Sequence, residues 1–191
     1  MRLVLYTLPA VIAAGYLLGG RLRNLSHITL RYPAAGIAGL VLQVLPARGS
    51  TGLLLLIASL VLMVVFAGAN WRLSGFALIA VGLWANLIVV ALNDGMPVTA
   101  SAFVRSGQTE GLADLAAGGR HHLATPHDDL VFLGDAIPIP GPVNRAMSIG
   151  DLVAYAGAMW FVIAGMRTRT RSEPTLGTHH ESDSTLAEAS A

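Results

Sequence analysis

Apolar residues occur in long runs along the chain, separated by short polar stretches up to residue 92 and by one long polar stretch after it. A helix needs about 17 to 25 mostly apolar residues to cross the hydrocarbon core of a bilayer. Four runs reach or approach this length, and none has a charged residue inside it apart from Asp151 near one end. They cover residues 3–18, 52–67, 73–92 and 149–166. The pattern therefore predicts four transmembrane helices.

A fifth apolar run, "YPAAGIAGLVLQVLP", covers residues 32–46 and is shorter than the others. Pro33 suits the first turn of a helix, and Pro46 suits its end. We expect a fifth, short span here, and a re-entrant or interfacial helix is the alternative. The predicted fold class is all-α: a polytopic helical membrane protein with about five transmembrane helices. One long loop, residues 93–148, connects the last two.

The composition of the chain agrees with a membrane location. Hydrophobic residues make up 54% and charged residues only 12%, whereas soluble domains have about 25% charged residues. All 12 basic residues are arginine, and alanine and glycine are abundant, which suggests a bacterium with GC-rich codons. The absence of cysteine excludes disulfides and thiolate ligands.

Several classes of partner are not indicated by the sequence. The arginines are scattered and the net charge is only +1, so nothing favours nucleic-acid binding. No glycine-rich phosphate loop is present, and we expect no cofactor. The lipid bilayer is the expected partner, and a protein partner or a homo-oligomer stays open.

The positions of the arginines predict an orientation. With five spans, seven arginines fall on one side, and two fall in short segments on the other. Because short cytoplasmic segments carry an excess of arginine, we expect the amino terminus outside and the carboxyl terminus in the cytoplasm. The predicted location is the bacterial cytoplasmic membrane, with the 93–148 loop extracytoplasmic. The seven are Arg21, Arg23, Arg31, Arg72, Arg167, Arg169 and Arg171, and the two are Arg2 and Arg48.

The predicted organisation is a helical membrane domain, residues 1–167, followed by a tail. Residues 168–191 are rich in Ser, Thr, Glu and Ala and have no apolar stripe. Such a segment cannot bury enough apolar surface to fold, so we expect a disordered cytoplasmic tail.

The long loop begins with "NDGMPV", residues 93–98. Asn93 and Asp94 tolerate left-handed backbone, and Pro97 prevents the helix from continuing, so one interpretation is a helix C-cap. The functional interpretation is that Asn93 and Asp94 line a polar binding pocket at the membrane surface. Both interpretations can hold together.

Farther along the loop, "RHHLATPHDD" gathers three histidines and two aspartates at residues 120–129. Imidazole and carboxylate groups suit zinc, but no helical His-x-x-x-His spacing fixes the ligands. We therefore predict no metal site and expect a polar loop in which one histidine makes a structural bond. His127 is a candidate binding residue, as are Asn93, Asp94 and Ser148.

Two Gly-Asp dipeptides place Asp135 and Asp151 around the start of the last span. Ser148 and Asp151 in "SIGD" form the capping-box pattern, in which each side chain bonds a free backbone N–H of the first helical turn. Asp135 has no such explanation. If the two carboxyl groups lie close together, one pKa rises and the pair can share a proton, as in aspartic hydrolases. Asp135 and Asp151 are therefore the candidate catalytic residues.

Two resemblances depend on these motifs. The pieces "NDGMPV", "LVFLGDAIPIP" and "MSIGDLVAYAG" resemble a family of uncharacterised bacterial integral membrane proteins, over residues 1–167. That resemblance implies a helical membrane protein and no biochemical role. Residues 133–157 are also similar to lipoprotein signal peptidase, a membrane aspartic peptidase. The similarity places Asp151 and Asp135 at its two catalytic aspartates.

Two hypotheses follow from the sequence. The first is a structural, partner-binding or small-solute-binding module that presents an extracytoplasmic loop, and whether the protein is an enzyme stays open. No span interior contains an ionisable residue that would mark an ion path, which argues against a pump or channel. The second is a membrane-embedded aspartic hydrolase or peptidase that uses Asp135 and Asp151 on a peptide or lipid-linked substrate.

Overall fold

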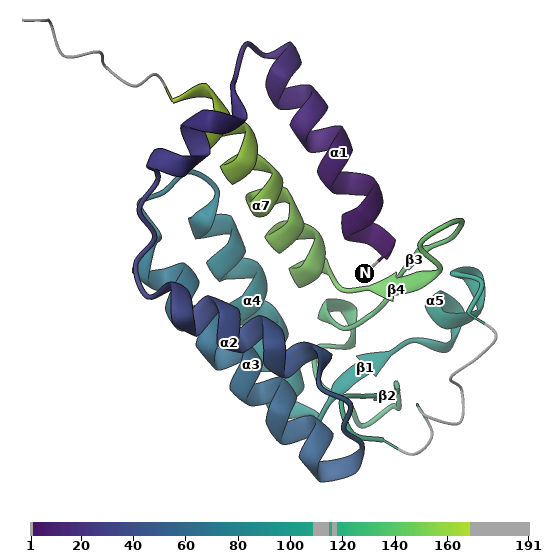
Figure 1. Ribbon diagram of the computed structural model, residues 1–191. Helices are drawn as coiled ribbons and strands as arrows, with labels where there is room; N and C mark the ends of the chain where they lie inside the picture. The colour runs from purple at the N-terminus through teal and green to yellow at the C-terminus, as the bar shows by residue number, and fades with distance from the viewer. Residues whose placement is uncertain (1, 109–114, 116–117, 169–191) are drawn as a thin grey trace, which may run out of the picture.

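Five apolar helices and a small folded cap make up the described part of the chain (Figure 1). The computed structural model describes residues 2–108, 115 and 118–168. The helices are α1 (Arg2–Leu17), α2 (Pro33–Val44), α3 (Gly49–Ala69), α4 (Phe76–Leu92) and α7 (Ile149–Arg167).

These helices occupy the five apolar runs of the sequence, and local residues fix their ends. Pro33 is the first residue of α2, where its missing N–H costs no hydrogen bond. Gly75 has a φ of 85° and precedes α4, which therefore begins at residue 76 instead of 73. Asn93 ends α4 as its C-cap.

The helices pack side by side in the order α1, α7, α4, α3 and α2 (Figure 1). An edge-to-face aromatic chain joins three of them, because the ring of Phe76 lies 5.5 Å from that of Phe66 and 5.1 Å from that of Phe161. Such pairs contribute about 0.5 to 1.5 kcal/mol beyond area burial. The buried core around them contains Leu60, Val64, Ala67, Leu83, Val89, Val90 and Met96.

Glycines allow α4 and α7 to approach closely. A Cβ atom at Gly157 would lie 2.6 Å from the carbonyl oxygen of Gly75, and one at Gly82 would collide with the carbonyl oxygen of Gly150. Gly75 and Gly82 are seven residues apart at α4, as are Gly150 and Gly157 in α7, so the two contacts lie on one stripe. Small residues of this kind bring backbones together where membrane helices meet.

The described residues between 93 and 148 fold into a cap that covers one end of the bundle (Figure 1). The all-α class fits the mostly helical chain, but the cap adds short strands that the apolar pattern did not predict. β1 pairs with β2 in parallel, and β3 pairs with β4 antiparallel. The cap contains β1 (Met96–Val98), α5 (Ala100–Arg105), β2 (His121–Leu123), η2 (Val131–Leu133), β3 (Ile137–Ile139) and β4 (Arg145–Met147).

Arg120 fastens the cap to the end of α2. Its guanidinium donates hydrogen bonds to the carbonyl oxygens of Leu42, Gln43 and Leu45 at 2.9, 2.7 and 3.0 Å. The last carbonyls of a helix have no partner within the helix, and a positive charge there also suits the helix dipole. The backbone carbonyl of Arg120 in turn accepts the N–H of Met96 at 2.9 Å, so one residue links α2, β1 and β2.

Length and composition make α3 and α7 suitable for crossing a membrane. Residues Tyr6–Leu17, Pro33–Val44 and Phe76–Leu92 are shorter apolar helices. The tail predicted to be disordered lies outside the described residues from residue 169 onward.

The close approach of α4 and α7 predicts that Gly157→Ala destabilises the protein. The added methyl group meets the backbone of Gly75 and the N–H of Ile79, 2.8 Å away, so the helices must separate. We expect a loss of about 1 to 3 kcal/mol, the usual cost of overpacking. The midpoint of thermal unfolding of the purified protein in detergent measures it.

Gly68→Ala is the matched control, because this helical glycine in α3 has nothing within 4 Å of an added Cβ. Alanine there favours the helix by up to about 1 kcal/mol. Equal unfolding midpoints for the two variants would show that the glycine stripe does not set the spacing of α4 and α7.

Candidate functional site

Asp151 lies in the first turn of α7, directly below the cap. The Oγ of Ser148 accepts the backbone N–H of Asp151 at 2.9 Å, which is the N-cap that the sequence predicts. The other half of the capping box differs from the prediction. The Asp151 carboxylate accepts a hydrogen bond from the Nδ2 of Asn86 at 2.6 Å, and no bond to the Ser148 N–H is recorded among the described contacts. Helix α4 therefore holds this carboxylate.

Asn86 is a residue that the sequence analysis missed. Its side chain is buried, and its Oδ1 accepts the hydroxyl of Ser148 at 2.8 Å while its Nδ2 donates to Asp151. A buried amide costs free energy unless it is hydrogen-bonded. A lone Asn in the apolar run "LWANLIVV" was therefore a signal that a polar partner lies on another helix.

Asp135 lies over the start of α7 because the cap turns back on itself. Ile137 of β3 is paired with Met147 of β4, so the residues before β3 lie opposite the residues after β4. The backbone also holds Asp135 against β1: its N–H donates to the Pro97 carbonyl at 2.9 Å, and its carbonyl accepts the Thr99 N–H at 3.2 Å. Asp135 is only 7% exposed. The structure thus brings Asp135 and Asp151 to the same end of α7.

The electrostatics of Asp135 depend on this location. Burial, followed by the negative charge of Asp151, raises the pKa of Asp135 from 3.8 to about 7, and Arg145 acts in the opposite direction. Desolvation disfavours the ionised carboxylate, and a second negative charge adds to that cost. Near neutral pH, Asp135 therefore exchanges a proton beside the charged Asp151.

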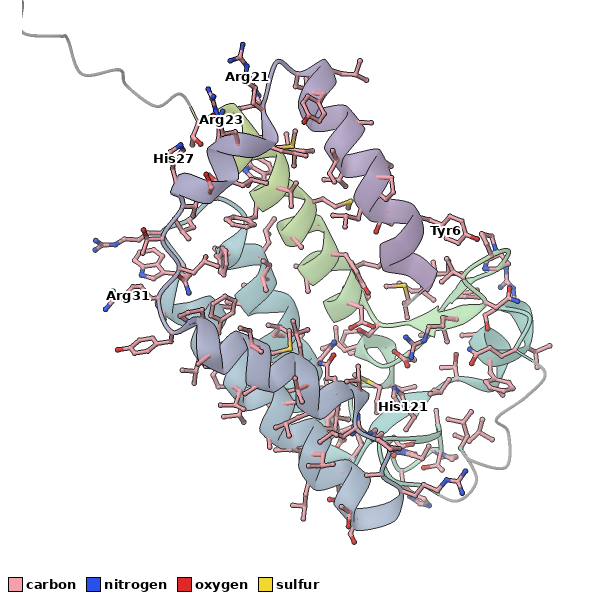
Figure 2. The ribbon with its side chains drawn as sticks, in the orientation of Figure 1. Tyr6, Arg21, Arg23, His27, Arg31 and His121 are labelled. Atoms are coloured by element: carbon pink, nitrogen blue, oxygen red, sulfur yellow. The ribbon has the colours of Figure 1, made fainter. Side chains whose placement is uncertain are left out.

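His121 joins the pair from β2. Its Nε2 lies 3.6 Å from the Oδ2 of Asp135. Partial burial among protein atoms, then the positive charges of Arg145 and Arg120, lower the pKa of His121 to about 4. The imidazole is thus neutral at pH 7, and its contact with Asp135 is not an ion pair. Because 38% of the His121 side chain is exposed, it borders both Asp135 and solvent, in the cap (Figure 2).

Asn93 has a structural role. Its side-chain amide donates to the carbonyl of Val89 at 2.8 Å and to the carbonyl of Asp129 at 2.9 Å, and its Oδ1 accepts the Asp129 N–H at 2.7 Å. The C-cap interpretation therefore holds, with an addition: the same side chain fastens the turn at residues 125–129 to the end of α4.

Asp94 and His127 lie apart from the carboxyl pair. Asp94 is exposed, with a φ of 51° that follows from its place in the turn after α4. His127 is exposed too, and its N–H donates to the Oγ1 of Thr125 at 3.3 Å. In the part of the chain that the structure describes, no recorded contact joins either residue to Asp135 or Asp151.

The neighbouring histidines His121 and His122 bind different carboxyl groups. The Nε2 of His122 lies 3.0 Å from the Oδ1 of Asp128, whose Oδ2 accepts the Thr125 N–H at 2.6 Å. Burial raises the pKa of Asp128, but the hydrogen bonds from Thr125 and His122 outweigh it and lower the pKa overall. Within residues 2–108, 115 and 118–168, no three His, Asp or Glu side chains are grouped to hold a metal ion.

Comparison with protein families gives one match. A family model described as a family of unknown function, DUF5317, matches residues 26–163, more than half of the chain. The chain belongs to this family. Comparison with curated proteins gives no match, and comparison with solved structures gives none either.

The DUF5317 match includes the whole candidate site: Asn86, His121, Asp135, Ser148 and Asp151 all lie between residues 26 and 163. The description of the family gives no biochemical role. The similarity of residues 133–157 to lipoprotein signal peptidase therefore stays a hypothesis about these two aspartates.

The raised pKa of Asp135 predicts how Asp135→Asn changes the pH dependence of stability. Between about pH 4 and pH 7 the unfolded chain loses the Asp135 proton while the folded chain keeps it. The wild type therefore loses stability as the pH rises through this window, and loses no more above it. A shift from 3.8 to about 7 corresponds to on the order of 4 kcal/mol. Unfolding of the purified protein at a series of pH values measures it.

Asparagine does not titrate, so the stability of Asp135→Asn relative to the wild type is expected to rise across the same window. Asp129→Asn is the control, since Asp129 is exposed and its hydrogen bonds to Asn93 use only its backbone N–H and carbonyl. Parallel pH profiles for the wild type and Asp135→Asn would contradict the assignment.

Proposed function

We propose that the chain is a multi-pass protein of the bacterial cytoplasmic membrane whose extracytoplasmic cap binds a small polar solute at Asp135, Asp151 and His121. Support for the membrane location comes from the sides of the helices, where large apolar side chains are exposed. Monomeric soluble proteins rarely expose contiguous apolar patches larger than a few hundred Å². The exposed side chains include Leu40, Leu54, Val65, Val81, Trp84, Ile88 and Trp160.

Support for the orientation comes from the separation of charge along the bundle. Among the described residues, every carboxylate lies between Asp94 and Asp151, in the cap or next to it. Arg21, Arg23 and Arg31 lie at the opposite end (Figure 2). An excess of arginine in short segments marks the cytoplasmic side, and the long 93–148 segment counts little. In short segments, this end also has Arg72 and Arg167, whereas the cap end has Arg2 and Arg48. The cap therefore faces outward.

The observation that carries the binding function is the pairing of the half-exposed His121 with the buried Asp135. A neutral imidazole and a proton-exchanging carboxyl group lie 3.6 Å apart, within the field of the Asp151 carboxylate. These groups can accept and donate hydrogen bonds. In small-molecule sites, a few polar groups among apolar side chains typically fix the orientation of the ligand. A solute with hydrogen-bond donors suits Asp151 best.

A second candidate, a membrane-embedded aspartic hydrolase, is favoured by the raised pKa of Asp135 beside the carboxyl group of Asp151. Asp151 would accept a proton from water as the water oxygen attacks a carbonyl carbon. Asp135 would donate its proton to the leaving group as the bond to that carbon breaks. A carboxyl group whose pKa is raised by burial and by a neighbouring carboxylate is suited to the acid role in such a pair.

The proposed topology predicts a labelling pattern for three matched Ser→Cys variants. The chain has no cysteine, so each variant carries a single thiol. Ser101 is exposed in α5 of the cap, whereas Ser26 and Ser74 are exposed at the arginine-rich end. In intact cells stripped of any outer membrane, a membrane-impermeant maleimide is expected to label Ser101→Cys only. After detergent permeabilisation all three are expected to react.

Labelling of Ser26→Cys or Ser74→Cys before permeabilisation would contradict the orientation. A chain recovered in the soluble fraction after cell lysis would contradict the membrane location itself.

Asp135→Asn and Asp151→Asn distinguish the two candidate functions. For a hydrolase, cells with either variant are expected to accumulate the same uncleaved lipid or peptide in their membranes, because the reaction needs both the acid and the base. Mass spectrometry of the membranes detects this uncleaved substrate. For a solute-binding module, both variants are expected to lose a ligand-induced rise in unfolding temperature, with no change in membrane composition. Asp129→Asn should behave like the wild type in both measurements, and wild-type behaviour of Asp135→Asn in both would contradict each function.

A further inference from the structure

The arginine-rich end of the bundle is built around a short 3-10 helix, η1 (Leu22–His27). The backbone N–H of Arg21 and the side-chain amide of Asn24 both donate to the carbonyl of Met166, each at 2.7 Å. Gly165 makes room for the apolar side of η1, because a Cβ there would lie 2.5 Å from the Cδ2 of Leu25. The end of α7 therefore holds η1 in a fixed position.

The arginine and histidine side chains of this end face away from the bundle. Arg23 and His27 of η1 and the preceding Arg21 are exposed and project outward, and Arg31 projects farther along the same side (Figure 2). The backbone of Arg31 is fixed as well, since its N–H donates to the Oδ1 of Asn70 at 2.8 Å and its carbonyl accepts from Nδ2 at 2.9 Å. Among the described residues, no carboxylate lies at this end to pair with these arginines.

Large aromatic and aliphatic side chains close to the arginines in the sequence are exposed as well. Tyr16, Tyr32 and Trp71 are more than half exposed, and Leu17 is 88% exposed. The guanidinium of Arg72 lies 5.7 Å from the ring centre of Trp71. Tyr and Trp beside Arg are typical of the boundary between lipid headgroups and acyl chains, where an aromatic ring has one apolar and one wet side.

We infer that Arg21, Arg23 and Arg31, which we name the η1 platform, bind the headgroups of anionic phospholipids in the cytoplasmic leaflet. The inference rests on the proposed membrane location. Guanidinium groups bind phosphate through paired N–H donors. The platform backbone is already fixed by Met166 and Asn70, so little order has to be gained when a headgroup binds. The exposed leucine and tyrosine side chains near the arginines can pack against the acyl chains of a lipid. A free anion has no such chains, so these side chains favour a lipid.

The test uses the full-length protein purified in detergent and titrated with phosphatidylglycerol or with phosphatidylcholine, with bound lipid counted by native mass spectrometry. Each basic residue near an anionic surface contributes enough affinity for about a fivefold change in Kd. R21Q and R23Q are each expected to weaken phosphatidylglycerol binding about fivefold, and the double variant about 25-fold. R23K keeps the charge but loses the paired N–H donors, so its affinity should fall between those of the wild type and R23Q.

R105Q is the matched control, because Arg105 is an exposed arginine at the other end of the molecule, in α5. It is expected to bind phosphatidylglycerol like the wild type, and phosphatidylcholine should bind weakly to every variant. Wild-type affinity in the double variant, or equal affinity for the two lipids, would overturn the inference. Displacement of the lipid by inorganic phosphate at equal concentration would assign the site to a free anion and overturn it also.

If the chain is not a membrane protein, the experiment gives a different result. In that case the chain does not enter vesicles of either lipid, and the proposed function falls together with the inference. Entry into both kinds of vesicle with unchanged lipid affinity in R21Q/R23Q overturns the η1 platform alone.

Discussion

The side-chain amide of Asn86 joins α4 to the first turn of α7, and the geometry of the candidate site depends on this contact. The amide accepts from Ser148 and donates to Asp151 at once, which requires the two helices to lie very close together. Gly82 and Gly150 allow that approach, since a Cβ at Gly150 would collide with the Oδ1 of Asn86. The small glycines let the helices come close enough for the Asn86 hydrogen bonds to form. The hydrogen bonds in turn compensate the cost of burying the Asn86 amide between the helices.

The site follows from that constraint and from the attachment of the cap. With Asp151 fixed by α4, the strand pairing of the cap brings Asp135 to the same place, and Arg120 holds the neighbouring strand to the end of α2. Each carboxyl group then has its own environment. Asp151 accepts a hydrogen bond from Asn86 at a helix amino terminus, which suits a negative charge. Asp135 is buried beside that charge and a neutral His121.

The sequence predicted the helices because long apolar runs carry their own signal, and it predicted the Ser148 cap because a capping residue acts on its own neighbours. It did not predict the strands of the cap, whose three residues each are too few to show an alternating pattern. Nor could it choose His121 over His127, because that choice depends on the pairing of β2 with β1. Asn86 was missed for the same reason: its partners are more than 60 residues away in the chain.

The most direct test of the account is an infrared titration of the protonated carboxyl band of Asp135 in the wild type and in Asp151→Asn. The account predicts that the wild-type band, assigned by its loss in Asp135→Asn, titrates near pH 7. In Asp151→Asn its midpoint should move to lower pH but stay above 3.8, because burial, the larger cause, persists. A midpoint near 3.8 in the wild type, or one that does not move when Asp151 loses its charge, would contradict the coupling of the two aspartates.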